Sequence, residues 1–179
     1  MKTIEEIKIE LLNNDLNKFI QSIADYDISG YDQYGNNILH YYILNNEAIT
    51  IPAKEIICEF LSRGLDVNSK QTKKDCRSAL YLAVQVRSKE LVALLLEMNA
   101  EVDLQDINGN TPLWQAVMNY RGDRYFIDLL LKYGAKPNLK NKHGVSPKKL
   151  ANTIANYDTK KLFDKQNNDT HAPQSLNGD

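Results

Sequence analysis

The chain has 179 residues, of which 42% are hydrophobic and 25% charged, and its formal net charge is −1. This is the composition of a globular protein, and it gives no global field that would attract nucleic acid or an anionic membrane. The longest apolar run, Leu91 to Leu96, is far shorter than the roughly 20 residues that cross a bilayer. The two cysteines form no CxxC pair, and the first ten residues contain no secretory apolar segment. We therefore expect a cytoplasmic protein with reduced thiols.

Two amphipathic helices are predicted at the amino-terminal end, over Ile4 to Leu12 and Leu16 to Ala24. No turn motif like those farther along the chain precedes them. We therefore expect a degenerate capping unit with a polar outer face. This end is acidic, with seven Asp and Glu against three Lys from Met1 to Asp32.

Two signatures alternate along the rest of the chain with a period of about 33 residues. The first is a turn followed by a helix start. It reads DQYGNNILH at 32–40, SALYLA at 78–83, DINGNTPLWQA at 106–116 and NKHGVSPKKLA at 141–151. The second reads LSRGLDVN at 61–68, LEMNAEVD at 96–103 and LKYGAKPN at 131–138. Such alternation indicates a repeat protein rather than generic amphipathic helices.

The residue types in both signatures predict helix ends. Thr111 and Ser146 can cap a helix that proline begins. Gly64, Gly134 and Asn99 follow the second helix, where a left-handed residue ends it.

Apolar residues recur on one face of each second helix, and a small residue recurs in each first helix. The apolar set is Ile56, Ile57, Phe60, Leu61, Leu91, Val92, Leu95, Leu96, Phe126, Ile127, Leu130 and Leu131. The small set is Ala83, Ala116 and Ala151. Gly35, Gly109 and Gly144 are expected in an exposed turn, and Cys76 takes the same slot in one copy.

The pattern resembles the ankyrin repeat family, whose unit is a β-turn and two antiparallel helices carrying a TPLHxA motif. The resemblance extends from about Ile4 to Asp164 and implies an all-α, ankyrin-repeat solenoid with β-turn loops. The expected units are a capping repeat at 1–30, repeats at 31–70, 71–104 and 105–139, a capping repeat at 140–165 and a disordered tail at 166–179. Leu162 and Phe163 are expected to close the stack.

Two irregularities interrupt the period. About six residues are inserted near Glu47 to Pro52, and a smaller insertion lies near Arg121 to Asp123. Insertions in such arrays map to loops on one face, and that face is often a binding face. A tolerated surface loop is the alternative.

No catalytic, metal or cofactor site is predicted. The chain lacks HExxH, GxSxG, P-loop and GxGxxG motifs. His40 stands at the family's histidine position, where the resemblance implies a tie between turn and neighbouring backbone. Cys76 and His143 are the remaining candidates for a cryptic enzyme, but Arg77 is the one basic neighbour of Cys76 and no metal partner accompanies either residue.

The family's variable positions, carried over to this sequence, predict a concave surface that binds a partner protein. These positions are Gln33, Tyr34, Asn36, Leu44, Asn45, Lys74, Asp75, Arg77, Gln85, Ile107, Asn108, Asn110, Trp114, Met118, Asn119, Lys142 and His143. Tyr42 stands where other repeats have alanine and is assigned to the core. For Tyr34 and Trp114, a packing role and a role as a binding hot spot both stay open.

Three functions are consistent with this pattern. The first is a monomeric, non-catalytic module that occupies a partner, most specifically a stand-alone bacterial ankyrin protein that neutralises a cognate toxin. The second is a host-directed effector or signalling adaptor that uses the same face. The third is a nucleic-acid or phosphoinositide binder, because nine lysines oppose two aspartates from Lys132 to Lys165. The sequence contains no known nucleic-acid-reading module, which disfavours the third hypothesis.

Overall fold

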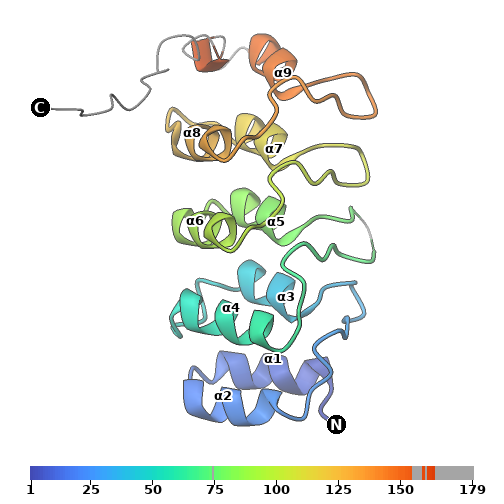
Figure 1. Cartoon of the computed structure of the whole chain (residues 1–179), viewed down its shortest axis with the longest axis vertical. Coiled ribbons are helices and arrows are strands. Elements are labelled where there is room, and N and C mark those ends of the chain that lie inside the picture. Colours follow the sequence, from blue (N-terminus) through green and yellow to red (C-terminus); the bar gives the residue numbers. More distant parts are fainter. Residues whose placement is uncertain (74, 155–158, 160, 164–179) are drawn as a thin grey trace, which may run out of the picture.

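The computed structural model describes residues 1–73, 75–154, 159 and 161–163. Within this part of the chain, nine α-helices form and no strand does. They are α1 (Ile4–Leu12), α2 (Leu16–Ile23), α3 (Ile38–Leu44), α4 (Ala53–Ser62), α5 (Ala79–Gln85), α6 (Lys89–Glu97), α7 (Pro112–Met118), α8 (Tyr125–Lys132) and α9 (Pro147–Thr153). Helix pairs lie one above another, and long turns project to one side of the stack (Figure 1). The fold is the all-α solenoid that the sequence predicts.

The helices begin and end where the sequence predicts. Thr111 and Ser146 each accept a hydrogen bond from the backbone N–H three residues ahead, and proline follows both. Gly64, Gly134 and Asn99 have φ angles of 91°, 87° and 62° after the outer helices. These left-handed residues let the chain leave one pair and enter the next turn.

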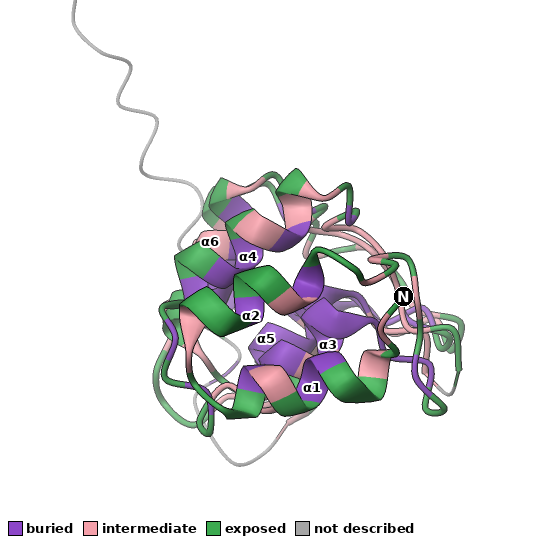
Figure 2. Ribbon diagram, turned by 90° about the horizontal axis from the view of Figure 1, so that it is seen from below, coloured by how far each residue is buried: buried purple, intermediate pink, exposed green. Residues whose placement is uncertain are grey.

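The core is continuous from one pair to the next. Along α4, α6 and α8, the predicted apolar positions are buried except Leu61 and Leu131, which are half-buried. The inner helices contribute Ala83, Ala116 and Ala151, at most 4% exposed. Viewed from the amino-terminal end, buried residues gather between the two layers of helices (Figure 2). Because each pair covers its neighbour, stability is spread over the inter-repeat interfaces.

The larger insertion is a packed part of the fold. The loop from α3 to α4 covers residues 45–52, whereas the loop from α5 to α6 covers only 86–88. Ile49 and Ile51 within it are each 5% exposed. Asn14, in the turn between α1 and α2, donates to the carbonyl of Ala48 at 3.1 Å and accepts from the N–H of Thr50 at 2.6 Å. The insertion therefore lies against the amino-terminal unit.

The amino-terminal end of the stack differs from the expectation in one respect. The amino-terminal pair forms as predicted, but its outer face is not wholly polar, because Ile9, Leu12 and Ile20 are 60%, 43% and 36% exposed. At the other end, Leu162 and Phe163 are buried against the core, as predicted. The proposed tail at 166–179 lies outside the described residues.

Candidate protein-binding surface

Three of the projecting turns are shaped by a side-chain oxygen near the start of the turn. Asp32 Oδ1 accepts from the N–H groups of Tyr34 at 2.9 Å and Asn36 at 2.8 Å. Asp106 and Asn141 accept from the residues two and four ahead in the same way. These bonds fix the backbone of each turn, so the side chains at its tip are held outward.

Backbone hydrogen bonds then join each turn to the next. Three N–H to carbonyl bonds do so: Thr72 to Gly35 at 3.0 Å, Ile107 to Asp75 at 2.7 Å and Lys142 to Asn108 at 2.9 Å. Because consecutive turns are bonded, they form one continuous edge of the stack.

The turns are exposed, as expected, but Gly35 and Gly109 themselves are buried within them. A Cβ on Gly35 would lie 2.5 Å from the backbone nitrogen of Lys73, and one on Gly109 would lie 2.9 Å from that of Lys142. Their φ angles of 83° and 81° also favour glycine. Close stacking of the turns is therefore the reason for glycine here. Cys76 occupies the corresponding slot with a φ of 52° and is half-buried.

Most of the predicted contact residues are accessible. The exposed ones are Gln33, Tyr34, Leu44, Ile107, Asn108, Met118, Lys142 and His143. The half-buried ones are Asn45, Asp75, Arg77, Gln85, Trp114 and Asn119. Lys74 lies outside the described residues.

Asn36 and Asn110 are placed differently from the other candidates. Each is 8% exposed, and each side-chain NH₂ group donates to the aspartate that shapes its own turn. Their Oδ1 atoms accept from Gln71 at 2.6 Å and Asn141 at 2.8 Å in the following turns. Both amides are used inside the fold, so we leave these two residues out of the contact surface.

Arg77 connects the turns to the inner helices. Its guanidinium pairs with Asp75 at 2.9 Å, donates to Gln85 Oε1 at 3.0 Å and lies 5.2 Å from the centre of the Tyr81 ring. Tyr81 in turn donates its hydroxyl to Gln115 Oε1 at 2.9 Å on α7. Turn and helix residues thus form one surface, held by polar contacts across two repeats.

Apolar side chains stand at intervals on that surface. Tyr34 is 55% exposed and Ile107 46% exposed at turn tips, and Leu44 and Met118, the last residues of α3 and α7, are 40% and 43% exposed. Leu44 also borders an open hollow of about 430 Å³ that the first insertion residues and Val86 complete. Exposed apolar groups on a rigid frame are typical of protein interfaces.

Trp114 replaces the family's histidine and stays half-buried. Its Nε1 atom is buried and has no hydrogen-bond partner in the described part of the chain. The indole N–H therefore lies in the interior of the protein, while part of the ring stays accessible to solvent.

His40 has the structural role that the resemblance implies. The side chain is fully buried; its Nδ1 accepts from the N–H of Asn37 at 3.2 Å, and Nε2 lies 3.1 Å from the carbonyl of Ser69. Burial lowers the pKa of His40 to about 4, although the Ser69 carbonyl and the charge of Asp32 oppose the shift. Among the described residues, no group of three or more His, Cys, Asp or Glu is placed to hold a metal ion.

Sequence reasoning missed two polar links. Lys8 of α1 pairs with Asp32 at 2.7 Å in the interior, and Tyr81 bonds Gln115 one repeat away. The ion pair of Lys8 could have been predicted from the sequence. Lys8 falls on the apolar stripe of Ile4, Ile7 and Leu11, and a lysine buried there needs an acidic partner.

The geometry defines a helical-repeat protein whose turns and inner helices form a continuous surface. The family model for ankyrin repeats, in three copies, matches residues 48–141, more than half of the chain. The chain belongs to the ankyrin repeat family, which makes it a protein–protein interaction module. Ankyrin repeats are generally non-catalytic.

Individual relatives match over parts of the chain. A putative ankyrin repeat protein of fowlpox virus is 30% identical over 112 residues, which are 60% of this chain and 32% of the relative. A putative ankyrin repeat-containing protein of Treponema pallidum is 34% identical over 92 residues, 51% of this chain and 30% of the relative. The human 2-5A-dependent ribonuclease is 44% identical over 69 residues, 38% of this chain and 9% of the relative.

The chain spans about a third or less of the length of these curated relatives. No helix in the described residues is long and apolar enough to cross a membrane.

Proposed function

We propose that the chain binds one partner protein through the surface made by its turn tips and the ends of its inner helices. The observation that carries this proposal is the exposure of Tyr34, Leu44, Ile107 and Met118, each at least 40% accessible, on a frame of bonded turns. A surface that is already ordered loses little conformational entropy on binding. Aromatic residues and methionine are also enriched at interfaces.

In its most specific form, the proposal is that the chain inhibits this partner by covering its surface, as an immunity protein neutralises a cognate toxin. A continuous, rigid surface suits such occlusion. A signalling adaptor or host-directed effector would use the same residues with lower affinity.

The first experiment is capture of partners from native lysate by the tagged chain, washed at low and then high salt, followed by affinity measurement with the purified partner. The double variant Tyr34→Ala, Ile107→Ala should weaken binding about 30-fold or more, because truncation of hot spots costs at least about 2 kcal/mol. Ile9→Ala, Leu12→Ala is the matched control, since it removes exposed apolar groups from the amino-terminal end instead. Equal weakening by both variants would contradict the proposed surface.

A second assay tests the toxin hypothesis separately. The captured partner should stop cell growth when expressed alone and should be harmless when this chain is co-expressed. A harmless partner would overturn the immunity role and leave the binding surface intact. Several weak partners would favour an adaptor, and nucleic acid that is lost at high salt would favour the lysine-rich end around Lys148 and Lys149.

A further inference from the structure

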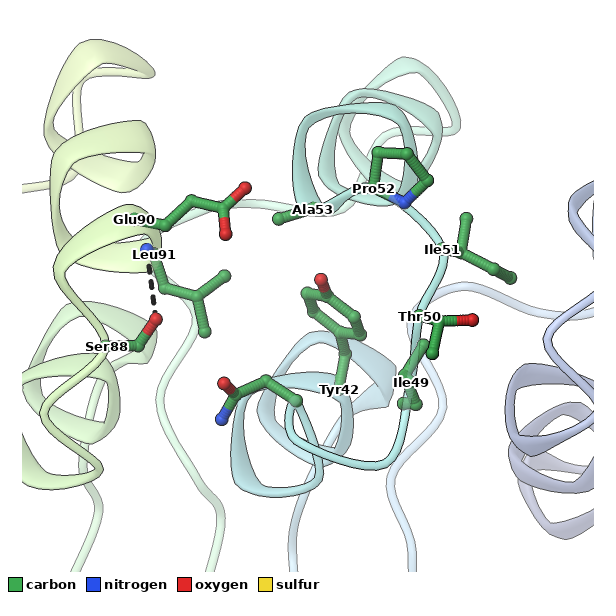
Figure 3. A pocket seen from close by; sticks show the side chains of 10 residues that line it. Tyr42, Ile49, Thr50, Ile51, Pro52, Ala53, Ser88, Glu90 and Leu91 are labelled. Atoms are coloured by element: carbon green, nitrogen blue, oxygen red, sulfur yellow. Dashed lines mark hydrogen bonds between the residues drawn. The ribbon is translucent and has the colours of Figure 1, made fainter.

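A pocket of about 150 Å³ lies between the larger insertion and the beginning of α6 (Figure 3). One wall comes from α3 and the insertion, with Tyr42, Asn46 and residues 49–53. The other wall is formed by Ser88, Glu90 and Leu91. None of the predicted contact residues lines this pocket, although Asn46 also borders the hollow beside Leu44.

Tyr42 places an unpaired hydroxyl in this pocket. The residue is 2% exposed, and Figure 3 shows its hydroxyl directed away from α3 into the space below Ala53. Its hydroxyl forms no hydrogen bond with any described residue. The hydroxyl oxygen is not enclosed by the protein, so it is available to a hydrogen-bonding ligand that enters the pocket.

Glu90 extends over the same space from α6 (Figure 3). Its carboxylate forms no ion pair in the part of the chain that the structure describes. Burial, and to a smaller degree the charge of Glu90, raise the pKa of Tyr42 to about 12. The exposed carboxylate of Glu90 thus supplies a negative charge at the wall of the pocket.

The remaining polar side chains on the wall are the amide of Asn46 and the hydroxyls of Thr50 and Ser88, all of which can accept hydrogen bonds. Asn46 donates its NH₂ group to the carbonyl of Ile43 at 2.7 Å, which leaves Oδ1 as an acceptor. Ser88 Oγ accepts from the N–H of Leu91 at 3.3 Å. A ligand that donates several hydrogen bonds and carries positive charge would match this lining.

The next junction along the stack shows what fills such a space. Between α6 and α8, the guanidinium of Arg87 lies 5.7 Å from the ring centre of Phe126. Lys89 Nζ lies 2.7 Å from Asp123 Oδ2 and 4.7 Å from the ring centre of Tyr125. The protein's own cations occupy that junction.

In the repeat alignment, Pro52 takes the place of Arg87 and Glu90 takes the place of Tyr125. Lys54, the equivalent of Lys89, is exposed and does not line the pocket. Ser88 takes the place of Asp123, so the junction that contains the pocket keeps one acid, now Glu90, and has lost the cation at the Arg87 position.

We propose that this pocket binds the ammonium or guanidinium group of a ligand, with Glu90 as counter-ion and Tyr42 and Asn46 as hydrogen-bond acceptors. The group is either a free small cation or the side chain of a lysine or arginine on a partner. Both supply donors and charge without acceptors.

The test is a titration of the ¹⁵N-labelled full chain at low salt, followed through the backbone amides of residues 46–51, 53 and 88–91. The probes are methylguanidinium, ethylammonium and N-acetyl-arginine methylamide, with N-acetyl-citrulline methylamide as the neutral control. Saturable shifts confined to these residues are expected for the cations alone. Glu90→Gln should raise the dissociation constant about tenfold, because it removes the charge and keeps the shape.

Glu97→Gln is the matched control, because Glu97 is exposed at the other end of α6 and should leave affinity unchanged. Tyr42→Phe removes only the hydroxyl and should weaken binding several-fold. Binding of free ions with exclusion of the capped arginine would identify a small cation, and binding of both would show that a partner's side chain fits. No saturable shift, equal binding of the citrulline probe or unchanged affinity in Glu90→Gln would overturn the proposal.

Discussion

The ammonium of Lys8 lies 2.7 Å from Oδ2 of Asp32. The Lys8 side chain is 8% exposed and the Asp32 side chain 1% exposed. Lys8 also lies 4.9 Å from the ring centre of Tyr41 and bonds Glu5 at 3.0 Å. Burial works to raise the pKa of Asp32, but hydrogen bonds from Lys8 and Asn36 outweigh it and hold that pKa below its ordinary value. The pair fixes the amino-terminal helix to the first turn of the contact surface.

Removing Lys8 should strongly destabilise the fold. Lys8→Ala leaves Asp32 as a buried, unpaired charge, and the free energy of unfolding should fall by about 3–5 kcal/mol in urea denaturation. Lys18→Ala is the control, because the Lys18–Asp15 pair at 3.2 Å is 73% and 38% exposed and should contribute less than about 1 kcal/mol. Equal, small losses would mean that water replaces the ammonium beside Asp32.

The stacking of the turns can be tested with glycine substitutions at matched φ angles. Gly35 and Gly134 have φ angles of 83° and 87°, but only at Gly35 would a Cβ meet backbone, 2.5 Å from Lys73. Gly134→Ala should cost about 1–2 kcal/mol for the left-handed conformation alone. Gly35→Ala should cost more, measured by urea unfolding, and should also shift the amide signals of residues 71–73. Similar costs would argue against close contact of the turns.

Stability should fall as the solution is acidified below about pH 6.5. His40 is neutral in the fold with a pKa of about 4, so the unfolded chain binds a proton first. Its contribution is fully present above the unfolded pKa and is lost as the pH falls through 4, with a total of about 3 kcal/mol. Unfolding curves between pH 7 and 4 measure this loss. His40→Asn should flatten the profile, whereas His143→Gln, at an exposed turn tip, should leave it unchanged.

The interface between helix pairs should be sensitive to lost volume. Leu95 is fully buried on α6, and Leu95→Ala should cost about 2–5 kcal/mol because it leaves a cavity. Leu12→Ala is the comparison, since Leu12 is 43% exposed and the change should stay within about 0.5 kcal/mol. A small effect at Leu95 would show that neighbouring side chains collapse into the space.

Local chemistry explains why much of the fold was predictable. Thr111 caps a helix because its hydroxyl and the following proline act within four residues, and Leu95 is buried because its helix has one apolar face. Neither depends on distant parts of the chain. The position of the larger insertion also follows from counting residues between repeats.

Long-range packing explains what was missed. The burial of Gly35 and Asn36 depends on the approach of the next turn, which lies more than 30 residues away in sequence. The same is true of the pocket beside Tyr42, because its walls come from two repeats. Burial of the Tyr42 ring was predicted, but its unpaired hydroxyl was not.

The two hydrogen bonds of Asn14 to the larger insertion affect how the molecule unfolds. In a repeat array, each unit interacts with its neighbours alone, and the ends are expected to fray first. Here the amino-terminal pair is bonded both to the insertion and, through Lys8, to the first turn. The first two helix pairs should therefore open together as one cooperative unit. In hydrogen exchange at low denaturant, the most protected amides of α1 to α4 should then share one free energy of opening.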